Sequence, residues 1–216
     1  MPLRTEYITI GDRTYTLRLP ADIDAIYDAL IAKGEADPAF QDQQIPYWAD
    51  LWPSAIALGQ FLTERVELTP DIQVLELGCG LGLSGLVAAL MGASVIQTDY
   101  LPDALELARL NASLNMDAVP EFRLLDWREP DLSLKSPVIL AADIAYEERA
   151  FAPVAACFKA LLAEGGSIYL SEPGRAVARP FPAFLEKEGF ILNHFSRPID
   201  YRNIRTQVSV YHLMRK

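Results

Sequence analysis

One short stretch of the sequence combines glycines and acids in a pattern suited to binding a small ligand. Residues 74–85 read VLELGCGLGLSG, an apolar run with one acid, followed by three glycines at alternating positions. Glycine lets a ligand approach the backbone closely, and an acid at the end of the next apolar run can accept both hydroxyls of a ribose. We therefore predict a pocket for a ribose-bearing cofactor. Its residues from this region are Glu76, Gly78, Cys79, Gly80, Gly82 and Asp99.

The position of Glu76 separates two classes of ribose-bearing cofactor. Its carboxylate lies shortly before the first glycine, where a nicotinamide dinucleotide would place its pyrophosphate, and like charges so close together cost free energy. S-adenosylmethionine has no phosphate and carries two cationic groups, an α-amino group and a sulfonium. The dinucleotide pattern G-x-G-x-x-G would also need a glycine at Leu83. The sequence therefore favours S-adenosylmethionine and disfavours a dehydrogenase.

The elements expected around this turn alternate between strands and helices. Strands are expected at 72–77, 94–98, 120–125, 137–142, 166–171, 189–196 and 206–213, and helices at 83–91, 102–115, 147–163 and 176–188. This alternation indicates parallel strands joined by crossover helices. No helical pattern separates the last two strands, so they should pair in antiparallel fashion at one edge. We predict an α/β fold with a doubly wound, seven-stranded, mostly parallel sheet and an antiparallel last strand.

The residues before position 70 follow a different pattern. Residues 7–19 alternate in polarity on either side of a glycine turn, which indicates a β-hairpin. Residues 22–36 place apolar side chains on one helical face, and a second amphipathic helix begins at Pro53. We expect residues 1–69 to be a hairpin and helical elaboration packed on a cofactor-binding domain of residues 70–216, the two forming a single compact unit.

The composition limits the class of protein and its partners. The 216 residues are 51% hydrophobic and 22% charged, as in a globular chain. The formal net charge of -10 disfavours a nucleic-acid partner and would attract a cationic one, although acidity also serves solubility alone. The sequence shows neither a bilayer-length apolar run nor a signal peptide, so we expect a cytoplasmic protein without a membrane partner. Two cysteines and two histidines that form no cluster predict no metal site.

Four motifs that follow one another resemble those of class I, seven-strand methyltransferases that use S-adenosylmethionine. They are LELGCGLG, TDY, LLDWRE and VILAAD, and the resemblance extends over residues 70–216. It implies that Asp126 and Trp127 border the adenine, with Trp127 packed against the ring, and that Ala142 completes the pocket. Taken alone, the Asp-Trp pair could also be a turn at the end of a strand.

The segment PYWADLWPSAIALGQFL, residues 46–62, is similar to one found in the protein-lysine methyltransferases called methyltransferase family 16. In that family a tryptophan before this helix lies over the cofactor, and Trp52 is the matching position. Trp52 could instead be a core aromatic that anchors the added segment. The sequence LSEPGRAVARPF, residues 170–181, resembles the branch that contains the electron-transfer-flavoprotein β-subunit lysine methyltransferases. There, Arg175 would either touch the substrate or bridge a loop to a carboxylate.

The sequence AADIAYEE, residues 141–148, contains the D-x-x-Y motif of the same family, at Asp143 and Tyr146. Methyl transfer needs an uncharged amine about 3 Å from the methyl carbon, whereas a lysine arrives cationic with a pKa of about 10.4. A carboxylate and a phenol can hold the ammonium in place until its proton escapes to water. The resemblance thus implies that Asp143 and Tyr146 are the catalytic pair. The alternatives are a helix-capping acid and a pocket-wall aromatic.

The sequence as a whole predicts an S-adenosylmethionine-dependent methyltransferase that acts on lysine in a protein substrate. Methylation of a small amine or heterocycle is one alternative, because loops form the walls of the acceptor site and their conformation does not follow from the sequence pattern. A non-catalytic binding module that keeps the fold is another, and the intact acids Glu76, Asp99 and Asp143 speak against it.

Overall fold

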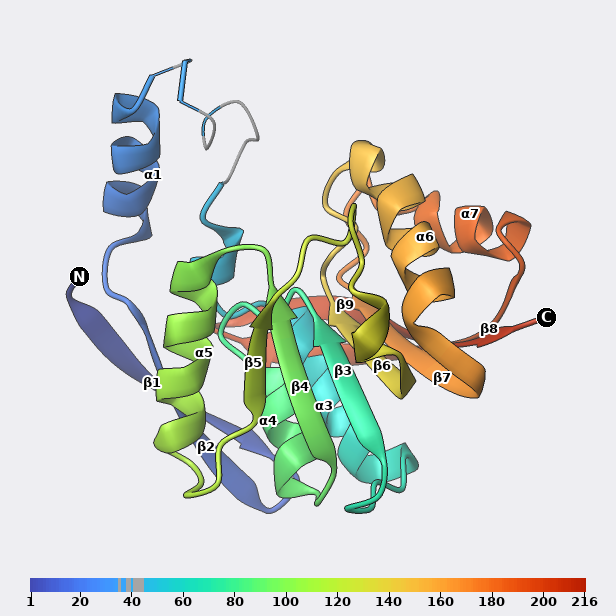
Figure 1. Ribbon diagram of the computed structural model, residues 1–216. Helices are drawn as coiled ribbons and strands as arrows, with labels where there is room; N and C mark the ends of the chain where they lie inside the picture. Colours follow the sequence, from blue (N-terminus) through green and yellow to red (C-terminus); the bar gives the residue numbers. More distant parts are fainter. Residues whose placement is uncertain (35, 38–39, 41–44) are drawn as a thin grey trace.

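The computed structural model describes residues 1–34, 36, 37, 40 and 45–216, and a seven-stranded sheet forms its centre (Figure 1). The strands are β3 (Gln73–Leu77), β4 (Ser94–Asp99), β5 (Glu121–Leu124), β6 (Ser136–Ala142), β7 (Leu162–Glu172), β8 (Phe190–Tyr201) and β9 (Ile204–Arg215), in the spatial order β5-β4-β3-β6-β7-β9-β8. Strand β3 pairs in parallel with β4 and β6, whereas β9 is antiparallel to both of its neighbours. The predicted α/β fold with an antiparallel last strand is confirmed.

The order of the strands places a ligand site beside β3. From β3 the chain moves outward to β4 and β5, and it then returns to β6 on the other side of β3. In open α/β sheets, ligands bind at this reversal, beyond the carboxyl ends of the strands. The glycine loop follows β3 directly, so the fold brings the loop to the reversal point.

Helices cover both faces of the sheet and build two apolar cores. The helices of one face are α3 (Pro53–Arg65), α4 (Leu83–Leu90) and α5 (Pro102–Ser113), and those of the other are α6 (Phe151–Leu161) and α7 (Phe181–Lys187). Successive residues of β3 point to opposite faces. Val74 accordingly packs in the α3–α5 core, and Leu75 packs in the α6–α7 core.

The N-terminal hairpin, β1 (Leu3–Ile10) and β2 (Arg13–Pro20), lies against α5. Its buried side chains join the same core as α3–α5. Asn111 of α5 and Asn115, in the turn that follows α5, bond its backbone. Asn115 Oδ1 accepts from Thr16 N at 2.9 Å, and Asn111 Oδ1 accepts from Arg18 N at 2.7 Å. These bonds continue the sheet-like pairing of β2 with side chains instead of a further strand.

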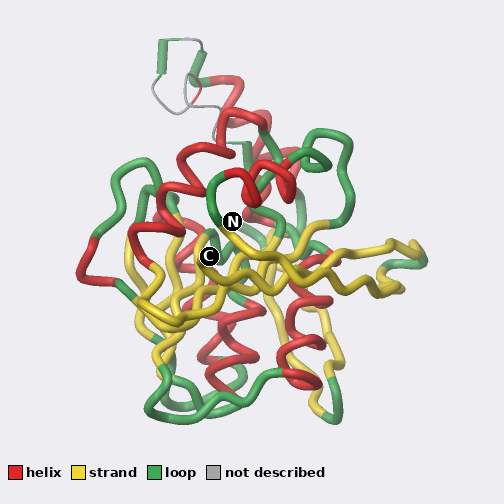
Figure 2. Tube along the Cα trace, turned by 90° about the vertical axis from the view of Figure 1, so that its right-hand side faces the viewer, coloured by secondary structure: helices red, strands yellow, loops and turns green. Residues whose placement is uncertain are grey.

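The helix α1 (Ile23–Ala32) follows the hairpin and projects from the body in both views (Figures 1 and 2). Asp22 caps it, because its carboxylate accepts from Ala25 N at 3.0 Å. The helix contributes no buried residue. Residue 35 of the helix predicted at 22–36 lies outside the described residues.

Two predicted helices begin later than the sequence pattern indicated. The helix expected at 176–188 is α7, which begins at Phe181. Pro180 disfavours helical backbone in the residue before it, and neither Pro180 nor Pro182 has the N–H that a helix from residue 176 would need there. The helix expected at 147–163 begins at Phe151, after the short turn η3 (Glu148–Ala150). Across the residues that the structure describes, no helix is long and apolar enough to cross a membrane.

Candidate functional site

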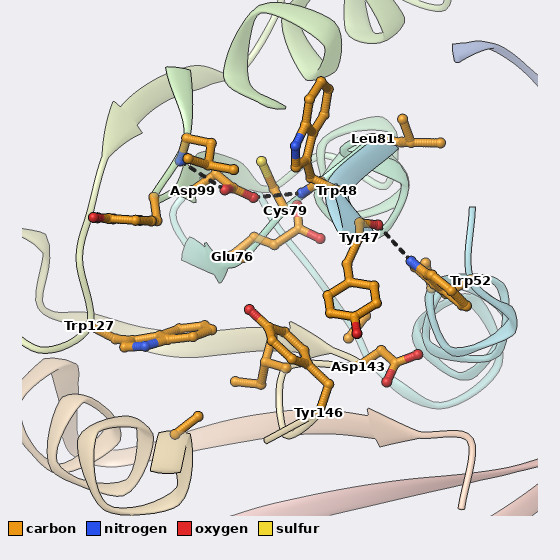
Figure 3. Close-up of a pocket in the computed structure, with 18 of the residues that line it drawn as sticks. Tyr47, Trp48, Trp52, Glu76, Cys79, Leu81, Asp99, Trp127, Asp143 and Tyr146 are labelled. Carbon is orange, nitrogen blue, oxygen red and sulfur yellow. Dashed lines mark hydrogen bonds between the residues drawn. The ribbon is translucent and has the colours of Figure 1, made fainter. Parts of the chain in front are cut away.

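A single cavity beyond the carboxyl ends of the central strands gathers every predicted site residue except Gly82 (Figure 3). Gly82 lies just behind the cavity wall, where it is the N-cap residue of α4. The cavity has an acidic end at the glycine loop and an aromatic end beside the β6 carboxyl terminus. The two ends correspond to the predicted cofactor and acceptor residues.

The glycine loop has a backbone that requires glycine at three positions. The φ angles are 65° at Gly78, 51° at Gly80 and 82° at Gly82, all in the left-handed region that side chains disfavour. A Cβ at Gly80 would lie 3.4 Å from the carbonyl oxygen of Trp48, and one at Gly82 would lie 3.0 Å from Ala108 Cβ. The loop therefore leaves its backbone bare toward the cavity.

Cys79 holds the loop through its backbone and not through its sulfur. Its N–H donates to the carbonyl of Thr98 at 2.8 Å, which ties the loop to β4. Burial, together with the nearby carboxylates of Asp99 and Glu76, raises the pKa of the thiol well above its ordinary value. The thiol therefore stays protonated and is a poor nucleophile.

Glu76 forms the floor of the acidic end and is almost completely enclosed, at 2% exposure. Its Oε2 accepts from Gly85 N at 3.0 Å and from Gln97 Nε2 at 2.5 Å. Burial raises the pKa of Glu76 to about 7, although these two donors oppose the shift. A cationic ligand group beside this carboxylate would restore its ionised form.

Gly85 is a site residue that the sequence reasoning missed. A Cβ at this position would lie 2.5 Å from both Glu76 Oε2 and Gln97 Nε2. Glycine therefore lets the Glu76 carboxylate reach the backbone of α4. The signal was a fourth glycine inside a helical pattern, where glycine is otherwise unfavourable.

Asp99 lines the acidic end beside the glycine loop (Figure 3). Its Oδ2 accepts from Gly80 N at 2.9 Å, and its Oδ1 accepts from Leu101 N at 3.1 Å. Burial raises its pKa, and these backbone donors limit the rise. Each carboxylate oxygen can accept a second hydrogen bond, so Asp99 can still bind a diol. Two desolvated carboxylates in one cavity fit a ligand that is cationic and carries a ribose.

Asp126 and Trp127 also line the acidic end of the cavity. The Trp127 ring approaches the glycine loop, because a Cβ at Gly78 would be 3.5 Å from its Cζ3. Asp126 accepts from the backbone and side chain of Arg128 at 2.9 Å, which fixes the turn that carries Trp127. The Arg128 guanidinium in turn lies 5.1 Å from the centre of the Tyr100 ring. Trp127 is therefore presented on an ordered turn, with its ring available as a flat wall.

Asp143 and Tyr146 define the aromatic end, to which Ala142 leads as the last residue of β6. Asp143 has a φ of 57°, unusual for a residue other than glycine, and its N–H donates to Ser171 O at 2.8 Å. Both of its carboxylate oxygens accept from Arg175, at 3.1 and 2.9 Å. Burial raises the pKa of Asp143, and Arg175 opposes that shift.

Tyr146 points into the cavity and packs against a second tyrosine, Tyr47, with ring centres 5.0 Å apart (Figure 3). Burial raises the pKa of the Tyr146 phenol to about 12. Its hydroxyl therefore stays protonated at neutral pH and can donate a hydrogen bond. Tyr47 lies in the turn η1 (Tyr47–Ala49), and its carbonyl accepts from Trp52 Nε1 at 2.7 Å.

Trp52 lies at the aromatic end of the cavity. Its ring is covered by the Arg175 guanidinium, whose carbon lies 4.6 Å from the ring centre. The neighbouring Trp48 lies closer to the glycine loop, and its backbone passes over Gly80. Trp52 thus belongs to the group of residues around Asp143, and its predicted contact with the cofactor stays a prediction.

Three residues of the aromatic end lay outside the predicted site: Tyr47, Glu172 and Arg175. Glu172 is 3% exposed, and its Oε1 accepts from Ala145 N at 3.2 Å, inside the D-x-x-Y turn. Burial and the neighbouring Asp143 raise the pKa of Glu172 to about 8. Sequence signals existed for all three, since Tyr47 lies in the aromatic segment before α3 and the other two frame the Pro-Gly turn after β7.

The strand order and the acidic pocket at its reversal point define a class I methyltransferase, the class that uses S-adenosylmethionine. The chain matches the family described as lysine methyltransferase over residues 40–184, and it belongs to that family. The resemblance predicted from the motifs is thereby confirmed, and S-adenosylmethionine is the cofactor of the class.

Curated relatives and solved structures agree with this assignment. The chain is 32% identical over 137 residues to the electron transfer flavoprotein beta subunit lysine methyltransferase of Xenopus laevis, covering 61% of this chain and 54% of that protein. It is 38% identical over 112 residues to the histone-arginine methyltransferase METTL23 of Xenopus laevis, covering 49% and 47%. The chain thus spans about half the length of these relatives. Magnesium protoporphyrin IX methyltransferase from Synechocystis, solved with S-adenosylmethionine bound, shares the fold with a TM-score of 0.61 at 16% identity, covering 89% of this chain and 91% of that one.

Proposed function

We propose that this chain transfers a methyl group from S-adenosylmethionine to a lysine side chain of a protein. The observation that supports it best is that the D-x-x-Y pair, Asp143 and Tyr146, lines the same cavity as Glu76 and Asp99. An acceptor amine bound between Asp143 and Tyr146 would face the acidic end without crossing solvent. The family and the lysine-specific relative support the same choice of acceptor.

The proposed roles of the cofactor residues follow from charge and geometry. S-adenosylmethionine supplies an electrophilic methyl group when it is bound. Glu76 would bind the cationic methionine end, while the glycine loop, Gly78 to Gly82, would admit the ligand close to its backbone. Asp99 would accept the ribose hydroxyls, and Asp126, Trp127 and Trp52 would close the pocket walls.

The proposed roles of the acceptor residues follow from their ionisation. The Asp143 carboxylate would accept a hydrogen bond from the incoming ammonium and hold it in line for displacement. The Tyr146 phenol keeps its proton at neutral pH, so it would position the acceptor and not remove its proton. The amine would lose its proton to water before transfer, and the main contribution of the site would be orientation.

We also propose that residues 1–69 and 70–216 work as one compact unit, and that the chain acts in the cytoplasm. Hydrogen bonds between the hairpin and α5 with the turn that follows it support the first proposal. Two free, buried cysteines are typical of a reducing compartment and support the second. Fractionation of cells that produce the protein tests its location.

The test of the function uses S-adenosylmethionine with a labelled methyl group, incubated with the protein and a lysate from cells that lack it. We expect label in a protein band, located on lysine by mass spectrometry. Label confined to small molecules would contradict a protein acceptor and indicate a metabolite methyltransferase.

The Asp143→Asn variant separates the acceptor role from cofactor binding. It should reduce labelling at least tenfold, because one charge-assisted hydrogen bond is lost, while the Kd for S-adenosylhomocysteine stays unchanged. If the Kd rises in step with the loss of labelling, Asp143 is a cofactor residue instead.

A further inference from the structure

At the aromatic end, the Arg175 guanidinium already contacts two groups that could bind a substrate cation, the Asp143 carboxylate and the Trp52 ring. We propose that Arg175 is a specificity-determining residue. It occupies the edge of the Asp143 carboxylate and the face of the Trp52 ring that a substrate guanidinium would need. It leaves room for an ammonium. The inference rests on the proposed function and extends it to the choice between lysine and arginine. The choice is open among the relatives, which include both lysine and arginine methyltransferases.

The first of the two groups is the carboxylate of Asp143. Arg175 Nε lies 3.1 Å from Oδ1 and Nη2 lies 2.9 Å from Oδ2, so the two groups meet as a parallel fork. A carboxylate has about four lone-pair sites, and Arg175 takes one on each oxygen along the same edge. The remaining sites diverge from each other. A guanidinium binds carboxylates through two parallel bonds, which the free sites cannot accept, whereas an ammonium needs a single site.

The second group is the indole of Trp52. An aromatic face is the other feature that favours a guanidinium, through stacking and cation–π attraction. The Arg175 guanidinium carbon already lies 4.6 Å from the centre of this ring. The indole cannot turn away freely, because its Nε1 donates to the Tyr47 carbonyl at 2.7 Å.

The surroundings hold Arg175 in this position. Its carbonyl accepts from Ala178 N at 3.0 Å and Arg179 N at 3.2 Å, which fixes the turn that carries it. The side chain of Asp143 is only 4% exposed, so its partner is held away from competing water. Asp143 and Trp52, the two groups that Arg175 contacts, both line the cavity. Arg175 binds one edge of the Asp143 carboxylate, and the free lone pairs of that carboxylate remain for a ligand in the cavity.

The charges of the group suit one additional monovalent cation. Asp143 and Glu172 are both buried acids, and Arg175 is the cation paired with Asp143. Because the pKa of Glu172 is raised to about 8, an ammonium bound beside it would draw this acid into its ionised form. The three residues would then carry one net negative charge, which the single ammonium neutralises. Arg175 opposes the rise that burial causes in the pKa of Asp143, which favours the ionised carboxylate that receives that ammonium.

The test compares Arg175→Ala with Arg179→Ala, an exposed arginine of the same turn. Guanidinium chloride at millimolar concentration is titrated against each protein in the presence of S-adenosylhomocysteine, and binding is followed by calorimetry. The Arg175→Ala protein should bind guanidinium at the position that the Arg175 side chain leaves empty, between Asp143 and Trp52. The wild type and Arg179→Ala should not bind it. The double variant Arg175→Ala/Asp143→Asn should lose the binding, because its carboxylate fork is gone.

The second readout is the amino acid that carries the label after incubation with the lysate and acid hydrolysis. Wild type and Arg179→Ala should yield methyllysine. Arg175→Ala should yield at least tenfold less methyllysine than the wild type, and millimolar guanidinium should restore the methyllysine. In the same variant, the share of the label found in methylarginine should rise. Arg175→Lys should retain methyllysine, since its ammonium keeps Asp143 ionised. Binding of S-adenosylhomocysteine with unchanged Kd shows that each variant is folded. If the alanine variant is not folded, Arg175→Gln, which also removes the cation but keeps more of the side chain, replaces it in both readouts.

The outcomes separate the inference from the proposed function. If the wild type labels no protein, the proposed function fails. The guanidinium titration still tests whether Arg175 blocks a guanidinium site. If the wild type places its label on arginine, Arg175 does not exclude a guanidinium and the inference is wrong, although the chain remains a protein methyltransferase. Full lysine labelling by Arg175→Ala without any response to guanidinium would also overturn it.

Discussion

The charge state of single buried residues governs how this site can bind a ligand. Glu76 is enclosed by protein and shares its Oε2 between two donors. Desolvation is the largest cause of its raised pKa of about 7, so near neutral pH it is divided between its two forms. The ionised form attracts a cationic ligand and the protonated form does not. A ligand at this end should therefore release a proton from Glu76 when it binds below neutral pH.

The first prediction concerns Glu76→Gln and the pH dependence of binding. In the wild type, the affinity for S-adenosylhomocysteine should rise as the pH increases from about 6 to about 8, by at most tenfold per pH unit for one linked proton. In Glu76→Gln the affinity should be at least tenfold lower at the higher pH, and its dependence on pH should be nearly flat. Calorimetry at several pH values measures both quantities.

Glu129→Gln is the matched control, since Glu129 is an exposed acid near the cavity. Its affinity should follow the wild-type curve throughout. A wild-type affinity that falls as the pH rises would have the wrong sign for an acid attracting a cation. It would remove Glu76 from the methionine end of the cofactor.

At the scale of elements, helix α5 connects the N-terminal hairpin to the glycine loop. Asn111 is completely buried, and its amide oxygen and amide nitrogen bond two different elements. Its Oδ1 accepts from Arg18 N in β2 at 2.7 Å, while its Nδ2 donates to Leu81 O in the glycine loop at 3.0 Å. One side chain therefore fixes both the added hairpin and the loop that binds the ligand.

The second prediction is that Asn111→Ala weakens both stability and cofactor binding. Removing its side chain leaves the buried Leu81 carbonyl without its partner, which costs about 1–3 kcal/mol, and the part-buried Arg18 N–H also loses its partner. Urea unfolding should show the loss of stability, and the Kd for S-adenosylhomocysteine should rise as the loop carbonyl is released.

Asn115→Ala is the control, in the turn that directly follows the same helix. Asn115 bonds Thr16 of the hairpin on both of its backbone groups, at 2.9 and 2.8 Å, and the glycine loop is not among its partners. Its variant should lose stability while the Kd stays at the wild-type value. Equal effects of the two variants on the Kd would mean that the hairpin, and not the direct bond to Leu81, controls the loop.

The elements were more predictable than the details of the site. Strand and helix positions follow from hydrophobic periodicity, which the sequence carries locally, and the prolines at the start of α7 account for its later start. The acidic end was also predictable, since Glu76 and Asp99 end neighbouring strands. At the aromatic end the motif predicted Asp143 and Tyr146 but not their neighbours, because Tyr47 and the turn that carries Glu172 and Arg175 come from segments far apart in the chain. Their meeting depends on β6 and β7 being adjacent and on the segment before α3 folding over them.

At the scale of the whole molecule, both ends of the chain close over the α3 face. Arg202, in the turn between β8 and β9, pairs with Asp50 Oδ1 at 2.8 Å and with Glu6 Oε1 at 2.6 Å. This group joins β1, the segment before α3 and the last hairpin. Such half-exposed pairs contribute little stability each, but their geometry ties the elaboration of residues 1–69 to the last strands. This supports the proposal of a single compact unit.

The ligand-free protein also carries an electrostatic cost that depends on pH. Burial raises the pKa of four carboxyl groups in or beside the cavity: Glu76, Asp99, Asp143 and Glu172. When a folded-state pKa is higher than the unfolded one, the native state holds more protons between the two values. Stability is then lost as the pH rises through that interval. Burial lowers the pKa of His212, which acts in the opposite direction.

The third prediction isolates Glu172, whose folded pKa of about 8 exceeds the ordinary value of 4.5. The ligand-free wild type should become less stable to urea as the pH rises from about 5 to about 8, with a slope of up to about 1.4 kcal/mol per pH unit for each linked proton. Glu172→Gln can keep the bond from Ala145 N through its amide oxygen but cannot ionise. It should match the wild type near pH 5 and exceed its stability near pH 8. The difference between the two proteins cancels the contribution of His212, and the exposed Glu106→Gln should show no such difference. A Glu172→Gln protein that is less stable than the wild type near pH 8 would mean that the ionised carboxylate is stabilised by Arg175 more than burial destabilises it.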